Sequence, residues 1–444
     1  MARTIDDILN PEKFSTDDVI ALEKRYLAPC IGHYYKEPLF IARGKGALLY
    51  DNKGREYLDL FAGISTTLAG HCHPVEVDAI KRQLDRLMHA STLYPMLPMA
   101  LFAEKLISIC PPHLAKCFFT NSGSEANEAA LHLMKKFTGA FNVLALNGSF
   151  HGRTLMAMSL TNQGTWRQNV PYAAGTMAVP PAYCYRCDFG QKYPGCGLEC
   201  AHYVEKAIRC QTPNRIAGMI VEPIQGNGGV VDPPREYFKI VSETVKKYGG
   251  LLISDEVQTG FGRTGKMWGI ENWDVAPDMM TMAKGIGSGY PIGAFVATDE
   301  AASCLKPKDL FSTFGGNPVA SVAGFANIEI LLKEKFAERA LELGGYFKQG
   351  LLRLMDRHKF LGDVRGKGLM LGVEVVKDKR TKEPGTQETQ TILNEAKDGG
   401  VLLGAGGLDN NVLRIKPPIV VSKAQIDQGL EAIDKAFSAA EGER

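Results

Sequence analysis

The sequence predicts an α/β protein with a large domain, built around a mostly parallel sheet, and a smaller α+β domain. Between residues 61 and 322 short apolar runs alternate with helical patterns, which is typical of parallel strands joined by helices. Several of these runs end in polar or glycine-rich motifs, as expected where ligands bind at the carboxyl edge of such a sheet. Beyond residue 322 strands and longer helices are interleaved, so this region is predicted to form a second domain.

We expect the first sixty residues to form an N-terminal arm and part of the small domain. A helical pattern covers residues 17–26, and strand-like runs cover residues 40–42 and 48–50. The predicted division is therefore 1–60 for the arm, 61–322 for the large domain and 323–444 for the C-terminal small domain.

The C-terminal region is predicted to follow a bridging helix at residues 318–334. Strands are predicted at residues 361–364, 369–376 and 412–415, and helices at residues 336–357, 387–397 and 423–437. The charged segment 378–384 is expected to be a solvated loop.

A strand-to-helix turn in the large domain predicts an anion site. Residues 116–120 are strand-like, and the polar residues after them lead directly into a helical pattern. Ser122 and Glu125 have the spacing of a capping box. The free N–H groups of Gly123 and Ser124 would lie at the helix start, where the dipole favours an anion such as phosphate. Taken alone, the motif is equally well explained by an ordinary helix cap.

Asp255 and Lys284 follow two more strand-like runs and predict pyridoxal-phosphate chemistry. Asp255 follows the apolar run 250–254, and Lys284 follows the run 279–283. A carboxylate can keep a pyridine nitrogen protonated, and a partly desolvated lysine amine can form an imine. Either residue alone would be explained as an exposed charge at a strand end. The predicted anion site favours the cofactor.

Four other motifs are expected in the same pocket, each next to a predicted strand or helix. They contain Phe150, His151 and Arg153; Glu222; Thr313; and Arg414. Phe150 could place an aromatic face against a cofactor ring. Arg414 lies in an apolar run, where a guanidinium suits bidentate capture of a substrate carboxylate.

The order and spacing of these motifs resemble those of the class-III aminotransferases, pyridoxal-phosphate enzymes of the aspartate-aminotransferase fold (fold type I). The resemblance runs from about residue 38 to the last helix, and it looks strongest to the alanine-glyoxylate aminotransferase type 2 group. The segments that carry it are Gly70 to Pro74, Asp255 to Arg263, Thr281 to Gly287, Thr313 to Pro318 and Asp363 to Met370.

This resemblance implies a role for each candidate residue. Lys284 would form the Schiff base and move the proton at the substrate carbon, and Asp255 would pair with the pyridine nitrogen. The other cofactor contacts would come from Ser122, Gly123, Ser124, Phe150, His151, Glu222, Gln258 and Thr313. Arg414 would bind the substrate carboxylate, and Arg153 matches a position that contacts carboxylates in some relatives.

The resemblance also implies an assembly and a reaction. Thr313 would reach the phosphate from a partner subunit, so a homodimer, or a dimer of dimers, with shared active sites is expected. The enzyme would move an amino group from an amino acid or an ω-amine donor to a small 2-oxo acid of the pyruvate or glyoxylate kind.

One departure from the family pattern bears on the substrate. In the 4-aminobutyrate and ornithine aminotransferases, the motif resembling Gln225-Gly226-Asn227 ends in a glutamate that pairs with the carboxylate-binding arginine. Here the residue is Asn227. Without that countercharge, an amine donor lacking a carboxylate would leave Arg414 unpaired, which typically costs several kcal/mol. Alanine, pyruvate and glyoxylate all supply the carboxylate.

Two alternatives stay open at this point. Amino-acid racemases and phospholyases resemble the same family and share its lysine, aspartate and phosphate groups, so the outcome of the reaction is not fixed by these residues. A 4-aminobutyrate or ornithine type of ω-aminotransferase is the other alternative, if other groups replace the missing glutamate.

Composition excludes several other classes of function. The chain has 444 residues, 23% of them charged, and a net charge of +2, so it lacks the basic footprint of a nucleic-acid-binding protein. No apolar run reaches the roughly 20 residues of a membrane-spanning helix. The N-terminus has no apolar core of a signal peptide, and a cytoplasmic location is expected.

Four of the ten cysteines, Cys184, Cys187, Cys196 and Cys200, form a cluster within a Gly-, Tyr- and Pro-rich stretch. Their spacing could ligate a structural zinc ion. Typical zinc modules separate the two halves further, and class-III enzymes need no metal, so we expect free or redox-sensitive thiols and no metal site.

Overall fold

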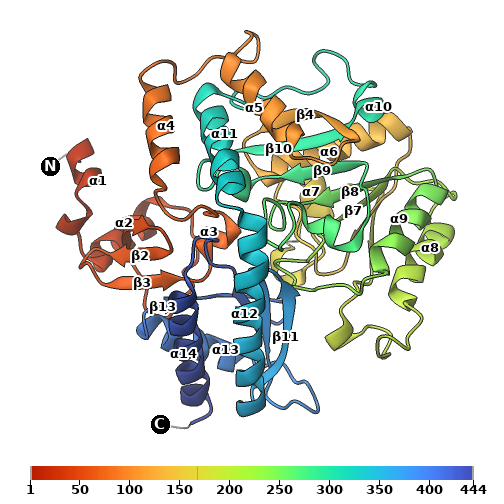
Figure 1. Cartoon of the computed structure of the whole chain (residues 1–444). Coiled ribbons are helices and arrows are strands. Elements are labelled where there is room, and N and C mark those ends of the chain that lie inside the picture. Colours follow the sequence, from red (N-terminus) through yellow and green to blue (C-terminus); the bar gives the residue numbers. More distant parts are fainter. Residues whose placement is uncertain (1–2, 168, 443–444) are drawn as a thin grey trace.

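Three sheets organise the residues that the structure, a computed structural model, describes, which are 3–167 and 169–442 (Figure 1). The largest of them has the strand order β4-β10-β9-β8-β7-β5-β6. Its strands are β4 (Leu114–Thr120), β5 (Val143–Leu146), β6 (Thr176–Val179), β7 (Gly218–Val221), β8 (Leu251–Asp255), β9 (Met279–Met282) and β10 (Gly293–Thr298).

Neighbouring strands from β6 to β9 pair in parallel, and β10 runs antiparallel to both β9 and β4. This mostly parallel sheet confirms the predicted fold class. Strands β6 and β10 have no counterpart among the predicted strands.

Helices cover both faces of this sheet, because its central strands bury side chains on both sides. On one face, Ala145 of β5 and Ile253 of β8 share a core with helix α6 (Gly123–Thr138). On the opposite face, the alternate residues Leu144 and Leu252 share the main core of the protein with helices α5 (Leu97–Ser108), α8 (Glu199–Gln211) and α9 (Tyr237–Lys247). The polar residues that follow the strands are thus held between two apolar layers.

The other two sheets belong to the smaller part of the molecule (Figure 1). One has the order β1-β2-β3-β13, with β1 (Ile41–Lys45), β2 (Leu48–Asp51), β3 (Glu56–Asp59) and β13 (Val401–Leu402). The other has the order β11-β12-β15-β14, with β11 (Leu361–Lys367), β12 (Met370–Val375), β14 (Gly404–Gly406) and β15 (Val412–Ile415).

The long helices of the C-terminal half agree with the predicted ones to within a few residues. They are α11 (Pro318–Lys333), α12 (Phe336–Arg357), α13 (Thr386–Asp398) and α14 (Lys423–Ala440). Asn317 caps α11, since its side chain accepts a bond from the N–H of Ala320 (2.9 Å), and Pro318 occupies the first turn. No helix in the described ranges is long and apolar enough to cross a membrane.

Shorter helices complete the described chain. In the N-terminal arm they are α1 (Ile5–Leu9), η1 (Pro11–Lys13) and α2 (Thr16–Tyr26). In the large domain they are α3 (Ala62–Ser65), α4 (Pro74–Leu84), α7 (Leu155–Ser159), η2 (Gly164–Trp166), η3 (Cys184–Arg186), η4 (Gly269–Trp273), η5 (Lys284–Ile286) and α10 (Asp299–Ala302).

Both ends of the chain contribute to one small sheet. Strand β3 pairs in parallel with β13, and Leu58 lies opposite Val401. The N-terminal strands are therefore physically joined to the C-terminal region, although the exact domain boundaries at residues 60 and 322 stay predictions.

Candidate active site

One cavity at the carboxyl edge of the large sheet brings most of the predicted cofactor residues together. It is lined by Gly123, Ser124, Asn127, Phe150, His151, Gly152, Glu222, Asp255, Val257, Gln258, Ala283 and Lys284. Strands β5, β7, β8 and β9 are neighbours in the sheet, and each delivers one loop to the cavity. The sequence separates these loops widely, but the parallel arrangement brings their starting points together.

Asp255 lies at the centre of a buried polar cluster. Its Oδ2 accepts bonds from Nδ1 of His151 and Nδ2 of Asn127, both at 2.8 Å, and its Oδ1 accepts from the N–H of Val257 at 3.1 Å. Since a carboxylate only accepts, Nδ1 of His151 carries the proton. Asn127 also donates to the carbonyl of His151 (2.6 Å) and so fixes both partners. Asn127 was not among the predicted site residues.

Lys284 faces this acid from the end of β9. Its φ of +46° lies in the left-handed region, which a lysine adopts only when its surroundings hold it there. Burial lowers the pKa of the amine, and the nearby carboxylates of Asp255 and Glu222 partly oppose that shift. A lowered pKa makes the neutral amine, the nucleophile needed for imine formation, more available near neutral pH.

Glu222 joins two loops of the cavity. Its two carboxylate oxygens accept bonds from the N–H groups of Phe150 and Gly226, each at 2.8 Å. Burial raises the pKa of this acid. Glu222 therefore holds the loop after β5 against the loop after β7.

The start of α6 is a tight cradle. Ser122 caps the helix by accepting a bond from the N–H of Glu125 at 3.2 Å. Gly152 is required here, because an added Cβ would lie 2.6 Å from Oγ of Ser124. The first N–H groups of the helix, from Gly123 onward, have no partner within the helix itself and lie at the cavity wall.

The predicted capping box is only half formed. The carboxylate of Glu125 does not bond back to the N–H of Ser122; it accepts from the N–H (2.9 Å) and the Nδ2 (3.1 Å) of Asn121. The expectation was wrong at this point because the Asn121 side chain offers the glutamate a second donor.

Gln258 is oriented by a buried lysine that sequence reasoning did not find. Nζ of Lys416 donates to Oε1 of Gln258 at 2.7 Å, and both side chains are buried. The Nε2 group of Gln258 is thereby left for the cavity. Burial, reinforced by the charges of Arg414 and Lys284, places the pKa of Lys416 well below its usual range.

Arg414 lies on β15 and is buried beside the cavity rather than in its wall. Its Nη1 donates to Oδ1 of Asn227 (3.1 Å), and its Nη2 donates to the hydroxyl of Tyr34 (2.7 Å). The guanidinium carbon lies 5.0 Å from the ring centre of Phe61. An added Cβ on Gly406 would approach Cδ of Arg414 to 2.9 Å, so only glycine fits there.

Like the helix cap Ser122 and the buried Arg414, the predicted residues Arg153 and Thr313 do not line this cavity within one chain. Arg153 is exposed, and its guanidinium donates to the carbonyl of Trp166 at 2.7 Å. Thr313 is also exposed and lines a separate depression together with Asn121. Arg153 still contributes its backbone, whose N–H donates to Oγ of Ser124 at 3.0 Å.

The four clustered cysteines lie in and around η3 and at the start of α8, and all are free thiols. Within residues 3–167 and 169–442, no group of three or more His, Cys, Asp or Glu side chains is arranged to hold a metal ion. The histidines of the 71–73 loop pair with acids instead, His71 with Asp59 at 2.8 Å and His73 with Glu334 at 3.3 Å.

The donor set of the cavity fits a phosphorylated pyridine cofactor. The buried carboxylate of Asp255 and the amine of Lys284, whose pKa is lowered, both line the cavity. The first residues of helix α6 also line it. Asp255 would hold a pyridinium nitrogen, and the helix start would hold a phosphate. Fold and site together define a pyridoxal-phosphate-dependent enzyme of fold type I.

Comparison with known sequences identifies the family. The profile of the family "Aminotransferase class-III" matches residues 31–437, and the chain belongs to this family. The alanine-glyoxylate aminotransferase 2 homolog 2, mitochondrial, of Arabidopsis thaliana is 44% identical over 96% of this chain and 88% of its own length. The human alanine-glyoxylate aminotransferase 2, mitochondrial, is 36% identical with the same coverage of both chains.

The family also contains other activities. A leucine/methionine racemase of Thermococcus litoralis is 37% identical to this chain, over 90% of this chain and 91% of its own length. Family membership alone therefore leaves the outcome of the reaction to the details of the site.

Solved structures agree with this assignment. A Bacillus anthracis aminotransferase superposes with a TM-score of 0.90 and 32% identity, covering 99% of this chain and all of its own. An amine transaminase of an uncultivated Pseudomonas species, solved with its pyridoxal phosphate bound, gives a TM-score of 0.88 and 30% identity, covering 94% of this chain and 98% of its own. The predicted cofactor, pyridoxal phosphate, is confirmed.

Proposed function

We propose that this transaminase moves the amino group of L-alanine to glyoxylate, which yields pyruvate and glycine. The observation that carries the proposal is the contact between Arg414 and Asn227. The guanidinium is buried, and among the described residues it has only neutral oxygen atoms as hydrogen-bond partners. A substrate carboxylate would supply the missing countercharge.

Several cavity residues have a role in this proposal. Pyridoxal phosphate, when bound, would supply an electron-accepting ring that stabilises negative charge on the substrate carbon. Lys284 would be the amine that binds the cofactor and moves the proton at the substrate carbon, and Asp255, fixed by His151 and Asn127, would keep the pyridine nitrogen protonated.

The remaining contacts position the ring and the phosphate. Phe150, which Trp166 contacts edge-on with ring centres 5.4 Å apart, would pack on the cofactor ring. Gln258 would donate to the ring oxygen, and Gly123 and Ser124 would hold the phosphate at the start of α6.

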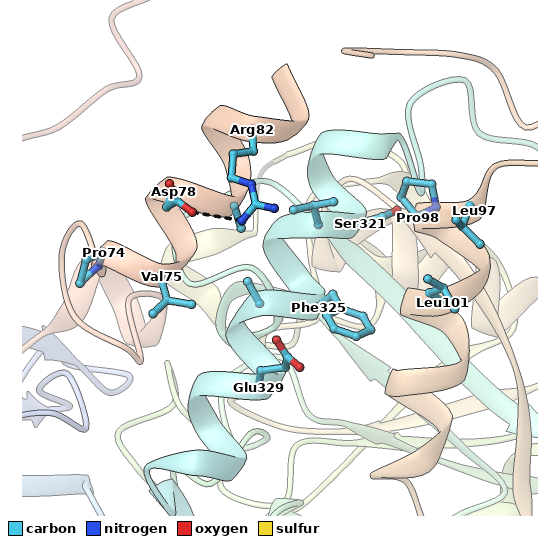
Figure 2. A pocket seen from close by; sticks show the side chains of 13 residues that line it. Pro74, Val75, Asp78, Arg82, Leu97, Pro98, Leu101, Ser321, Phe325 and Glu329 are labelled. Atoms are coloured by element: carbon cyan, nitrogen blue, oxygen red, sulfur yellow. Dashed lines mark ion pairs between the residues drawn. The ribbon is translucent and has the colours of Figure 1, made fainter. Parts of the chain in front are cut away.

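We further propose that the active unit is a homodimer in which Thr313 completes the partner's phosphate site. In favour of a dimer is an apolar groove of about 600 Å³ between α4, α5 and α11, lined by Val75, Leu101 and Phe325 among others (Figure 2). Its polar lining includes the ion pair of Asp78 and Arg82, 3.5 Å apart, and the carboxylate of Glu329 (Figure 2).

Leu97, which lines the groove at the start of α5, and Met88 and Leu93 in the segment between α4 and α5 are at least 66% exposed. Exposed apolar side chains gathered at an apolar groove are typical of interaction surfaces. Replacing Leu97 by Glu is expected to give monomers in light scattering, whereas Leu341→Glu, at an exposed leucine of α12, is expected to leave the assembly intact. Dimers in both variants would count against this interface.

The catalytic proposal is tested by the visible spectrum of the purified holoenzyme during addition of L-alanine without any oxo acid. The absorbance of the bound pyridoxal form is expected to convert stoichiometrically to that of the pyridoxamine form, and glyoxylate or pyruvate is expected to reverse the change. A racemase would leave the band in place while producing D-alanine. A persistent band without D-alanine would direct the search to ω-amine donors.

The cytoplasmic location expected from the sequence stays a prediction. The Arabidopsis and human relatives are named as mitochondrial proteins. Fractionation of cells that produce the full chain would decide between these compartments.

A further inference from the structure

A hydrogen-bonded series of two buried side-chain amides, called the amide chain below, ends at the guanidinium of Arg414. Nη1 of Arg414 donates to Oδ1 of Asn227 at 3.1 Å, and Nδ2 of Asn227 donates to Oε1 of Gln163 at 2.6 Å. Nε2 of Gln163 then donates to the backbone carbonyl of Gly407 at 3.0 Å. All three side chains are at most 7% exposed.

The two ends of this chain fix the orientation of every amide within it. The carbonyl of Gly407 can only accept, so Gln163 must present its NH₂ group there and its oxygen to Asn227. Asn227 must then use its own NH₂ group toward Gln163 and its oxygen toward Arg414. The guanidinium can only donate, so both ends require the same direction.

Backbone contacts make this arrangement stiff. The N–H of Gly407 donates to the carbonyl of Asn227 at 2.9 Å, which closes a loop with the side-chain bonds. On the other side of the guanidinium, the hydroxyl of Tyr34 accepts from Nη2 of Arg414 and donates to the carbonyl of Ala405 at 3.0 Å. Nε of Arg414 is buried without a partner among the described residues.

We propose that Gln163 is a positioning residue for substrate carboxylates, acting through Asn227. Gln163 fixes the orientation of the Asn227 side-chain amide, so the amide oxygen points at Arg414. This oxygen holds the guanidinium in place, but being neutral it does not cancel the positive charge. The inference rests on the proposed function and adds to it a residue outside the cavity. Gln163 precedes the helical turn η2, far in sequence from both partners.

Removal of Gln163 has a definite physical consequence. In Gln163→Met the side chain keeps its approximate size, but Asn227 loses the acceptor for its buried NH₂ group and can rotate. Rotation would turn that group toward the guanidinium, where two donors face each other. Arg414 would then shift away from its position, and carboxylate ligands would bind about tenfold more weakly.

The test is calorimetric titration of the holoenzyme with propionate, which has the carboxylate but no amine to react. Gln163→Met is expected to raise the Kd for propionate about tenfold. Gln225→Met is the matched control, since Gln225 is equally buried and its amide also donates to a backbone carbonyl, that of Asn147 at 2.8 Å. This control is expected to change the Kd less than twofold.

A double-mutant cycle separates positioning from a merely structural role. If Gln163 acts through Asn227, the variant Gln163→Met/Asn227→Ala should bind propionate no more weakly than Asn227→Ala alone. Gln163→Leu provides a second variant that offers the Asn227 NH₂ group no acceptor, so it should also weaken binding. The apparent KM for L-alanine should rise in parallel, with a smaller change in kcat.

Three results would overturn the proposal: an unchanged Kd in both Gln163 variants, an equal loss in the Gln225 control, or additive losses in the cycle. A wild-type enzyme that binds propionate but is not converted by L-alanine would instead count against the proposed donor alone. The amide chain would then still be tested by the propionate titrations.

Discussion

The two halves of the site are built in opposite ways. In the cofactor half, formed by Asp255, His151 and Asn127, both carboxylate oxygens have donors within the chain. In the carboxylate half, formed by Arg414, Asn227 and Tyr34, a buried cation has neutral acceptors only, and its Nε has none among the described residues. In the cofactor half the hydrogen bonds of the carboxylate are satisfied within the chain. In the carboxylate half the positive charge of Arg414 has no countercharge until a ligand supplies one.

This difference separates the chemistry of the site from its choice of substrate. A buried carboxylate with donors on both oxygens is held rigidly, so the group that it binds meets the same environment in every turnover. An unmatched buried charge is costly until a ligand of opposite charge arrives, so it discriminates by charge. Changes in the first half should therefore affect all substrates alike, and changes in the second should affect substrates selectively.

The largest effect is expected for Lys284→Ala, which should reduce turnover with every amino donor by about 10⁴-fold. The physical reason is the loss of both the imine-forming amine and the group that moves the proton. Turnover is measured with L-alanine and glyoxylate, and melting by circular dichroism should stay close to that of the wild type. Full activity in this variant would remove Lys284 from the mechanism.

Asp255→Asn should break the cofactor half itself. The amide cannot hold a pyridinium by charge, and its NH₂ group would face either the two donors that now bond Oδ2 or the N–H of Val257 that now bonds Oδ1. We expect a loss of at least about a hundredfold in kcat for all donors. If donors with and without a carboxylate on the reacting carbon lost activity to clearly different extents, the expectation that the cofactor half affects all substrates alike would be contradicted.

Asn227→Glu should break the carboxylate half while leaving the cofactor half intact. The introduced acid would neutralise Arg414. We therefore expect kcat/KM for L-alanine to fall roughly tenfold relative to kcat/KM for a donor with no carboxylate on the reacting carbon, such as 4-aminobutyrate. Asn227→Gln, which adds length but no charge, is the matched control. An unchanged ratio of the two donors would refute the charge argument.

Thr313 belongs to neither half of the site, so its substitution tests whether cofactor affinity can change without a change in donor preference. If the hydroxyl contacts the phosphate in the partner's site, Thr313→Val should weaken pyridoxal-phosphate binding about fivefold without changing donor preference. Cofactor release is followed by equilibrium dialysis. Thr313→Ser should retain the wild-type affinity, and equal losses in both variants would argue against a hydroxyl contact.

The smallest effect on turnover is expected for Lys416→Met, which reports on pH. Burial depresses the pKa of this amine in the folded protein, so the unfolded chain binds more protons between that lowered value and the ordinary value of about 10.4. Folding stability should therefore rise with pH across this window, by up to about 1.4 kcal/mol per pH unit.

The variant should lose this contribution, so its melting temperature should depend less on pH than that of the wild type. Lys435→Met, at an exposed lysine of α14 paired with Glu431, serves as the control and should keep the wild-type slope. Equal slopes in all three proteins would mean that Lys416 is charged in the folded state.

The cofactor half could be predicted largely from sequence, because each of its acids and its lysine directly follows an apolar strand. Strand ends in a parallel sheet meet at one edge, so local pattern and position coincide. Asn127 escaped prediction because it lies inside the helical pattern of α6, where a polar residue carries no signal of its partner.

The carboxylate half could be predicted only in part. Arg414 was predicted from its place in an apolar run and Asn227 through the family resemblance, but Gln163 and Lys416 become partners only through contacts between distant segments. Likewise β10 went unpredicted, although its residues are buried, because nothing in a short apolar run tells how it will pair. Residues whose roles depend on packing between domains carry no local pattern.

The pairing of β3 with β13 has a consequence for synthesis of the chain on the ribosome. Leu58 emerges early, but its partner Val401 is made near the end. At the usual 5–20 residues per second, the N-terminal strands wait on the order of half a minute before their sheet can close. During that interval the arm has no edge to dock on, so chaperones that shield nascent chains should engage this protein at its first sixty residues.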